Sequence, residues 1–432
     1  MCFFFITTAC LGEEMDNFFY EEWLLIGQPE HRYSKPFPIV KLSPSDDVKT
    51  SILINPEPGH RCRYANRLRN SNAYQDINIS DQTQVKLNKI SSSKVESLYM
   101  CGNNLLIQNY DSWVLLDNKT LEKISEGEWY ENGSTFFSVG SKFFAIQRKL
   151  DEISSKGELL SRTRGMWSED LIYNEIAYIK DKVIIAGYQT HPNLPEPVAP
   201  FGFLQSIPGD GFTEPNPKNM QRKIEKSNTI SFFEDIPNIP IYLDEKVIQP
   251  LVNRIAIFNY DMEVIRVIEG DFDPAFLSAG LDSIIYMLGI KKNSHKLYAF
   301  DEEGHLIYEN DIPKGLGDVA APPLVSPENE IFLIGKRGIA FFDKAGKLLW
   351  THKIEGNFNS PIFPLLYNDI LTVCYDSECK AFNRKGEVVF GFDKIEGNIK
   401  TPLISVDNGN YFIGTDIGLY RIYQTDAPSL KE

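Results

Sequence analysis

The chain has 432 residues, of which 42% are hydrophobic and 12% aromatic, and it carries a formal net charge of −15. This hydrophobic content is sufficient for a packed core. The acidic charge argues against a nucleic acid as partner, because phosphate binding needs a clustered basic face. The one dense basic run, at 60–69, is short and is interpreted as a solvated loop. The sequence contains no run of about 18 apolar residues, so it predicts no transmembrane helix.

Residues 1–80 contain no internal repeat and predict little regular structure. Phe18–Ile26 is compatible with a short helix or an edge strand, and five prolines between Pro36 and Pro58 then interrupt any regular element. We interpret this region as a tether that precedes the folded domain at 81–425. Residues 426–432 are interpreted as a C-terminal tail.

The first residues of the tether resemble the end of a bacterial lipoprotein signal. An apolar run, Cys2–Ala9, ends in small residues and is followed by Cys10 and then by the acidic stretch Gly12–Asp16. In such signals the cysteine is lipidated and becomes the new N-terminus. The run departs from the pattern because no basic residues precede it and because Thr7 stands where Leu is usual. The resemblance implies a lipid on Cys10 and a place in the bacterial cell envelope; an ordinary cytoplasmic N-terminus is the alternative.

From residue 84 onwards, short apolar strands alternate with turns. They fall into eight units, at about 95–125, 134–165, 172–226, 228–268, 273–311, 321–354, 361–395 and 401–423. The second and third units are degenerate, so seven units is the alternative count.

Residues 189–245 predict an insertion on this array. Ten of the 25 prolines lie between Pro192 and Pro250, with aromatic residues interspersed among them. Loops of this length are uncommon inside a compact domain and are usually functional or disordered. Two interpretations stay open. The segment is either a loop packed on the array or a partner-binding loop, whose contact residues would be Phe201, Phe203, Phe212, Phe232 and Phe233.

The second half of the array repeats with a period of about 40 residues. The copies begin at Phe258, Phe300, Phe342 and Phe382, with spacings of 42, 42 and 40. A repeat of this length is typical of a propeller, in which each unit buries its apolar faces only by stacking on its neighbours. The sequence therefore predicts an all-β protein, a β-propeller of four-stranded blades.

Each clear copy contains a tight turn between two apolar strands. Asp or Asn opens the turn, because its side chain can bond the backbone two residues further on. Gly closes it, because that position needs a positive φ. The strands just before these units, such as Ile331–Ile334, are apolar on both faces, as expected for strands that lie between two blades.

The last unit ends after three strands, although a ring must close or leave an exposed edge. The predicted fourth strand is Gln84–Ile90, near the other end of the chain. We therefore expect an N-terminal strand to complete the final blade.

A search for catalytic motifs finds no constellation that carries chemistry. The six histidines are scattered, and neither a G-x-S-x-G elbow nor a phosphate loop occurs. Asp271 and Asp273 are interpreted as turn residues rather than as a calcium site. Cys374 and Cys379 flank a predicted hairpin turn. Two free buried thiols are the favoured interpretation, and a disulfide in an oxidising compartment is the alternative.

The repeats resemble the quinoprotein-like (PQQ-like) propeller repeat. The likeness is carried by Leu297–Asp301, Gly346–Trp350 and Tyr411–Tyr420, and it extends over about 250–423. One class of this family comprises quinone-dependent dehydrogenases, which hold the cofactor on the ring axis with calcium and an aspartate base. The other class comprises non-enzymatic scaffolds, such as the propeller lipoprotein of the outer-membrane β-barrel assembly machinery.

This chain resembles the second class more closely, because it has no adjacent cysteine pair and no equivalent of the quinone site. The resemblance implies a monomeric, non-catalytic propeller that binds a protein partner and needs no cofactor. A quinoprotein-type oxidoreductase and a propeller that binds a small solute or glycan are the alternatives.

Overall fold

The computed structural model describes residues 85–424 apart from short gaps, the longest of which are 129–134, 165–170, 190–200, 233–239 and 355–361. The predictions for residues 1–80, for the lipid on Cys10 and for the tail lie outside the described residues. The described part consists of strands and two short 3₁₀ helices, η2 (Gly209–Gly211) and η3 (Lys314–Leu316). It contains no helix with the length and hydropathy that a membrane span requires.

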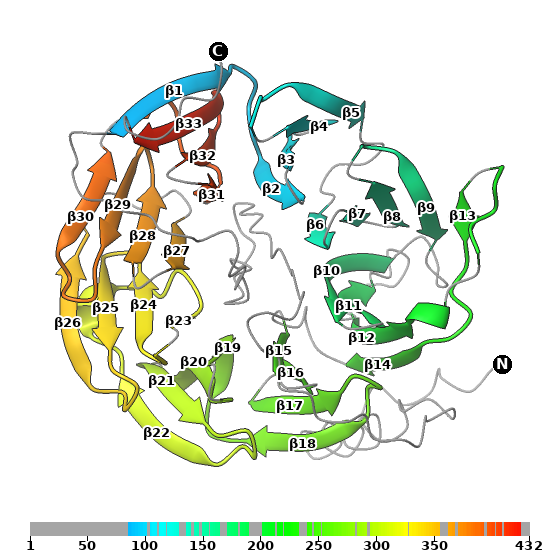
Figure 1. Ribbon diagram of the computed structural model, residues 1–432. Coiled ribbons are helices and arrows are strands. Elements are labelled where there is room, and N and C mark those ends of the chain that lie inside the picture. Colours follow the sequence, from blue (N-terminus) through cyan, green and yellow to red (C-terminus); the bar gives the residue numbers. More distant parts are fainter. Residues whose placement is uncertain are drawn as a thin grey trace, which may run out of the picture.

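The described strands form eight sheets arranged around a ring, each with its first strand nearest the centre (Figure 1). We number the sheets as blades in chain order. Blade 1 contains β2 (Ser97–Cys101), β3 (Asn104–Gln108), β4 (Ser112–Asp117) and β5 (Lys123–Glu128), and blade 2 contains β6 (Thr135–Val139), β7 (Lys142–Ile146), β8 (Lys149–Ser154) and β9 (Leu159–Arg164). Blade 3 contains β10 (Leu171–Ile179), β11 (Lys182–Gln189), β12 (Phe201–Pro208) and β14 (Asn228–Phe232), and blade 4 contains β15 (Ile241–Leu243), β16 (Lys246–Leu251), β17 (Arg254–Asn259) and β18 (Val264–Glu269).

Blades 5 to 8 correspond to the clear sequence repeats. Blade 5 contains β19 (Asp273–Ala279), β20 (Ile285–Lys291), β21 (Ser294–Phe300) and β22 (Leu306–Asp311), and blade 6 contains β23 (Leu324–Val325), β24 (Ile331–Gly335), β25 (Gly338–Phe342) and β26 (Leu348–Lys353). Blade 7 contains β27 (Phe363–Tyr367), β28 (Ile370–Tyr375), β29 (Glu378–Phe382) and β30 (Val388–Phe392), and blade 8 contains β31 (Ile404–Asp407), β32 (Asn410–Thr415), β33 (Gly418–Gln424) and β1 (Val85–Ser91). The predicted all-β propeller of mainly four-stranded blades is confirmed.

The ring closes through the predicted N-terminal strand. β1 pairs antiparallel with β33, from Val85 opposite Gln424 to Ser91 opposite Leu419. Blade 8 therefore takes three strands from the C-terminal end of the described chain and its outer strand from the N-terminal end, as Figure 1 shows. This pairing covers the edge of β33, which would otherwise expose unpaired backbone groups.

The core lies between the blades, because the central strands are buried on both faces. In β24, Ile331 and Leu333 pack in a cluster with residues of blade 5, whereas Phe332 and Ile334 pack in a cluster with residues of blades 7 and 8. Alternate side chains of one strand point to opposite faces of its sheet. Each such strand therefore joins two neighbouring blades, which explains the continuous apolar runs in the repeats.

The repeated turns have the predicted hydrogen bonds. In blade 7 the Asn383 side-chain oxygen accepts bonds from the backbone N–H groups of Lys385 and Glu387, at 2.9 and 3.0 Å. Gly386 has a φ of +81°. The turn thus satisfies its own backbone donors and directs the outer strand back along the blade.

The Pro-rich stretch contributes two strands to blade 3, so the prediction of one insertion over 189–245 needs correction. β12 and β14 lie within it and pair with each other from Gly202 opposite Phe232 to Ser206 opposite Asn228. β14 also belongs to blade 3, whereas the sequence placed residue 228 in the next unit. The link between these strands carries β13 (Gln221–Arg222), which adds in parallel to the outer strand β9 of blade 2. β14 follows β12 only after the link that carries β13, and no local sequence pattern shows which strand it pairs with, which is why the boundary was misplaced.

Candidate functional site

Two kinds of connection share one face of the ring. Because neighbouring strands of a blade are antiparallel, the turn between its second and third strands lies at the same end as the links that enter and leave the blade. We call this face the link face. The opposite face carries the turns between the first and second strands and between the third and fourth strands, and we call it the turn face.

On the link face, backbone hydrogen bonds join several of the described links to a neighbouring turn. In blade 6 the N–H groups of Lys336 and Arg337 donate to the carbonyls of Asp318 and Leu316, both at 2.8 Å. The Lys336 ammonium also lies 3.1 Å from an Asp318 carboxylate oxygen. These bonds fix the link 312–320 against the turn of the blade that it enters.

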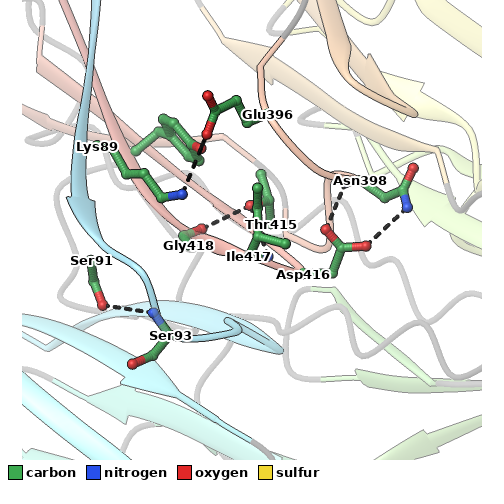
Figure 2. Close-up of polar contacts among 10 residues, drawn as sticks. Lys89, Ser91, Ser93, Glu396, Asn398, Thr415, Asp416, Ile417 and Gly418 are labelled. Carbon is green, nitrogen blue, oxygen red and sulfur yellow. Dashed lines mark hydrogen bonds and ion pairs between the residues drawn. The ribbon is translucent and has the colours of Figure 1, made fainter.

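Blade 8 contains an example with both backbone and side-chain bonds, which we call the closure seam (Figure 2). The Asp416 N–H donates to the Asn398 carbonyl at 3.0 Å, and the Asn398 N–H donates back to an Asp416 carboxylate oxygen at 2.8 Å. The Asn398 amide donates to the other carboxylate oxygen at 2.9 Å. The Thr415 hydroxyl donates to the Gly418 carbonyl at 3.1 Å. The link and the turn therefore satisfy each other's polar groups.

The closing strand joins the seam through Lys89. Its ammonium lies 3.4 Å from the Glu396 carboxylate and 5.6 Å from the centre of the Tyr420 ring. The Tyr420 hydroxyl donates to Glu396 at 3.3 Å. Burial opposes a charge on Lys89, but its hydrogen bonds to Tyr420 and Glu396 outweigh burial, so the pKa of Lys89 is raised. Lys89 is therefore a cation at neutral pH, and it links β1 to the link before blade 8.

The backbone also approaches very closely at this seam. A Cβ atom on Gly418 would lie 2.3 Å from the Ser91 carbonyl oxygen of the closing strand. Only glycine fits such an approach without a shift of the backbone. The seam therefore depends on Gly418 as well as on its polar contacts.

On the link face, exposed side chains project from links and turns that are hydrogen-bonded to each other. The Glu396 side chain is 72% exposed although it bonds Lys89, and Ile417 is 39% exposed at the tip of the seam turn. The bonds within the seam hold the Glu396 carboxylate and the backbone of Ile417 in place without covering either side chain. Such a surface can bind a partner with little cost of ordering its loops.

Of the aromatic residues predicted as a partner-binding loop, the three that the structure describes lie on two strands of blade 3. Phe203 is a core residue of β12 with 7% exposure, so its side chain is not available to a partner. Phe201 begins the same strand and Phe232 ends β14. Phe212 and Phe233 lie outside the described residues.

Cys374 and Cys379 form a disulfide, whereas the sequence favoured two free thiols. The turn between β28 and β29 has only two residues, so the cysteines are directly opposed, with Cα atoms 4.0 Å apart. Both side chains are fully buried. This local register, rather than any other feature of the chain, brings the sulfur atoms together.

One group of potential metal ligands was missed by the sequence analysis. Asp301, Glu303 and His305 are the group of three that the described residues contain, and they lie in the outer turn of blade 5. Asp301 already accepts a bond from the His305 N–H at 2.7 Å and contacts the His305 ring at 3.0 Å. Burial raises the pKa of Asp301, but these bonds outweigh it and the pKa is lowered. The group thus acts as a turn cap.

Comparisons with known proteins support the fold alone. No protein-family model and no curated protein sequence matches the chain. Among solved structures, the chain is similar to Sqt1 of Saccharomyces cerevisiae, with a TM-score of 0.57 and 11% identity over 81% of this chain and 100% of that one. It is also similar to the C-terminal WD40 domain of Sif2, with a TM-score of 0.55 and 11% identity over 78% of this chain and 98% of that one. These neighbours are WD40 propellers, and the likeness of the repeats to the PQQ-like pattern stays a prediction from the sequence.

Proposed function

We propose that this chain is a non-catalytic propeller that binds protein partners on its link face. The observation that carries the proposal is the closure seam, where Asn398 and Asp416 hold a turn and a link together while Glu396 and Ile417 remain exposed. A preorganised surface of this kind lowers the entropic cost of association. The similarity in fold to WD40 propellers is compatible with this role.

Affinity capture with a C-terminal tag tests the proposal. The test variant is Ile417→Glu, which places a charge at the tip of the seam turn. The matched control is Leu306→Glu, because Leu306 is 53% exposed on the outer strand β22. We expect Ile417→Glu to weaken capture of specific partners by about tenfold or more, and Leu306→Glu to leave it unchanged. Equal capture by both variants, or turnover of a substrate that depends on an added quinone, would contradict the proposal.

We also propose that a lipid on Cys10 attaches the chain to a bacterial envelope membrane. The support is the order of apolar run, small residues, cysteine and acidic stretch over 2–16. Intact-mass analysis of protein purified from membranes is expected to show a chain that begins at a lipidated Cys10. A chain with an unmodified Cys10 in the soluble fraction would contradict attachment and leave the scaffold role intact.

A further inference from the structure

Three basic residues lie on neighbouring segments at the link face of blade 6. Lys314 belongs to the link before the blade, Arg337 to the turn between β24 and β25, and Lys353 to the end of β26. Two consecutive backbone bonds hold these segments together. The Arg337 N–H donates to the Leu316 carbonyl at 2.8 Å, and the Ile354 N–H donates to the Arg337 carbonyl at 3.0 Å.

The packing around Arg337 confirms how close the three segments are. A Cβ atom on Gly317 would lie 3.1 Å from Cγ of Arg337, so the arginine stem lies over the link that carries Lys314. Lys353 is the register partner of Gly338, the residue next to Arg337. We call Lys314, Arg337 and Lys353 the basic triad.

The triad differs from its basic neighbours in lacking carboxylate partners. Lys291 lies 3.2 Å from Glu309, Lys296 lies 2.6 Å from Glu309 and 3.1 Å from Asp311, and Lys336 is paired with Asp318. In contrast, all three triad residues are exposed, and none has an ion pair or side-chain hydrogen bond to another described residue. Three neighbouring cations without ion-paired carboxylates of their own repel one another, and an anionic ligand would relieve that repulsion.

We infer that the basic triad is a docking point for an acidic segment of a protein partner, an inference that rests on the proposed scaffold function and specifies the partner's chemistry. A short acidic segment fits better than a nucleic acid. The chain carries a net charge of −15, which repels a long polyanion that extends beyond the triad. Charges farther away than a Debye length of about 8 Å are largely screened at physiological salt, so a short segment experiences mainly the triad itself.

A labelled hexaglutamate peptide tests the inference in the full-length protein. The test variant is Lys314→Glu/Arg337→Glu/Lys353→Glu. The matched control is Lys344→Glu/Lys347→Glu/Lys385→Glu, which makes the same change in net charge at exposed positions of the turn face. Fluorescence anisotropy is expected to show binding to the wild type that weakens as salt rises, a loss of about tenfold or more in the triad variant, and a change of less than about twofold in the control.

Three outcomes would overturn the inference: equal losses in both variants, equal binding of a hexaglutamine peptide, or tighter binding of a short oligonucleotide than of hexaglutamate. Circular dichroism melts of both variants establish that they are folded. Affinity capture then separates this inference from the scaffold proposal. If the triad variant captures the same partners as the wild type, the inference is wrong and the scaffold role stands. If the wild type captures no specific partner but binds hexaglutamate through the triad, the scaffold proposal is wrong.

Discussion

Gly386 has a φ of +81°, and a Cβ atom at this position would lie 3.0 Å from the Trp350 ring of the preceding blade. The Trp350 indole N–H donates to the Arg384 carbonyl in the same turn, at 2.9 Å. The turn of blade 7 therefore packs against the outer strand of blade 6 and accepts a hydrogen bond from it. Gly346 likewise lies against the Tyr308 ring of blade 5, so in these two pairs of repeats an aromatic residue and the next glycine form one contact between blades.

Gly386→Ala is expected to lower the free energy of unfolding by at least about 1–2 kcal/mol, the cost of a left-handed conformation for a residue with a Cβ atom. Urea denaturation measures the change. Gly315→Ala is the control, because no heavy atom lies within 4 Å of its Cβ position. We expect the control to stay within about 0.5 kcal/mol of the wild type. Losses of the same size in both variants would contradict the packing described for Trp350.

His352 makes the stability depend on pH. Burial, and then the nearby charge of Lys380, lower the pKa of His352 below its ordinary value of 6.5. The unfolded chain therefore takes up a proton before the folded chain does as the pH falls. The stability that comes from a neutral His352 is present above pH 6.5 and is lost as the pH falls through the folded pKa.

A His352→Gln variant, which cannot take up this proton, isolates the effect. Its thermal midpoint is expected to fall less than that of the wild type between pH 7 and pH 5. Parallel midpoint curves for the two proteins over this range would show that burial of His352 has no such consequence.

At the scale of elements, the hairpin β28–β29 is held by a buried disulfide. A bond that closes a loop of this size is expected to stabilise the protein by about 2 kcal/mol, through restriction of the unfolded chain. Cys374→Ala/Cys379→Ala should therefore lose about that much stability in urea denaturation. Adding a reductant should lower the stability of the wild type and leave that of the variant unchanged; sensitivity of both proteins to the reductant would contradict the assignment.

Removal of the closing strand tests how the ring is held together. A chain that lacks residues 1–91 has no β1, so the edge of β33 is exposed and Lys89 no longer reaches Glu396. We expect its thermal midpoint to fall by more than about 10 °C, with association through the open edge detected by size-exclusion chromatography. A chain that lacks only residues 1–80 retains β1 and is the control. If the two truncated chains behave alike, strand closure contributes little to stability.

Elements with a local signal could be predicted from the sequence, and contacts between distant elements could not. The Asn383–Gly386 turn, the doubly buried strands such as β24 and the closing strand β1 all followed from residue patterns. The addition of β13 to β9 and the bonds between Asn398 and Asp416 did not, because their partners are set by the arrangement of neighbouring blades. The sequence Ile-Glu-Gly-Asn occurs at both 354–357 and 395–398, and the second copy lies in the seam.

At the scale of the whole molecule, the ring has a link face, a turn face and a perimeter formed by the outer strands. The link face has turns and links bonded to each other, the closure seam and the basic triad. The outer strands at the perimeter carry exposed aliphatic residues, including Leu306, Leu348 and Leu349. The blades pack on one another through the buried side chains of their central strands. Substitutions at exposed positions on the link face or the turn face should therefore leave the fold intact. The faces can therefore be tested for binding one at a time.

The most direct test places a photo-crosslinking amino acid at Ile417 on the link face and, in a second protein, at Ala345 on the turn face. Both positions are exposed and lie in turns between strands. Irradiation in cells is expected to join Ile417 to a protein partner that Ala345 does not reach. Crosslinks from Ala345 alone, or no specific crosslink from either position, would contradict the claim that this propeller binds its partners on the link face.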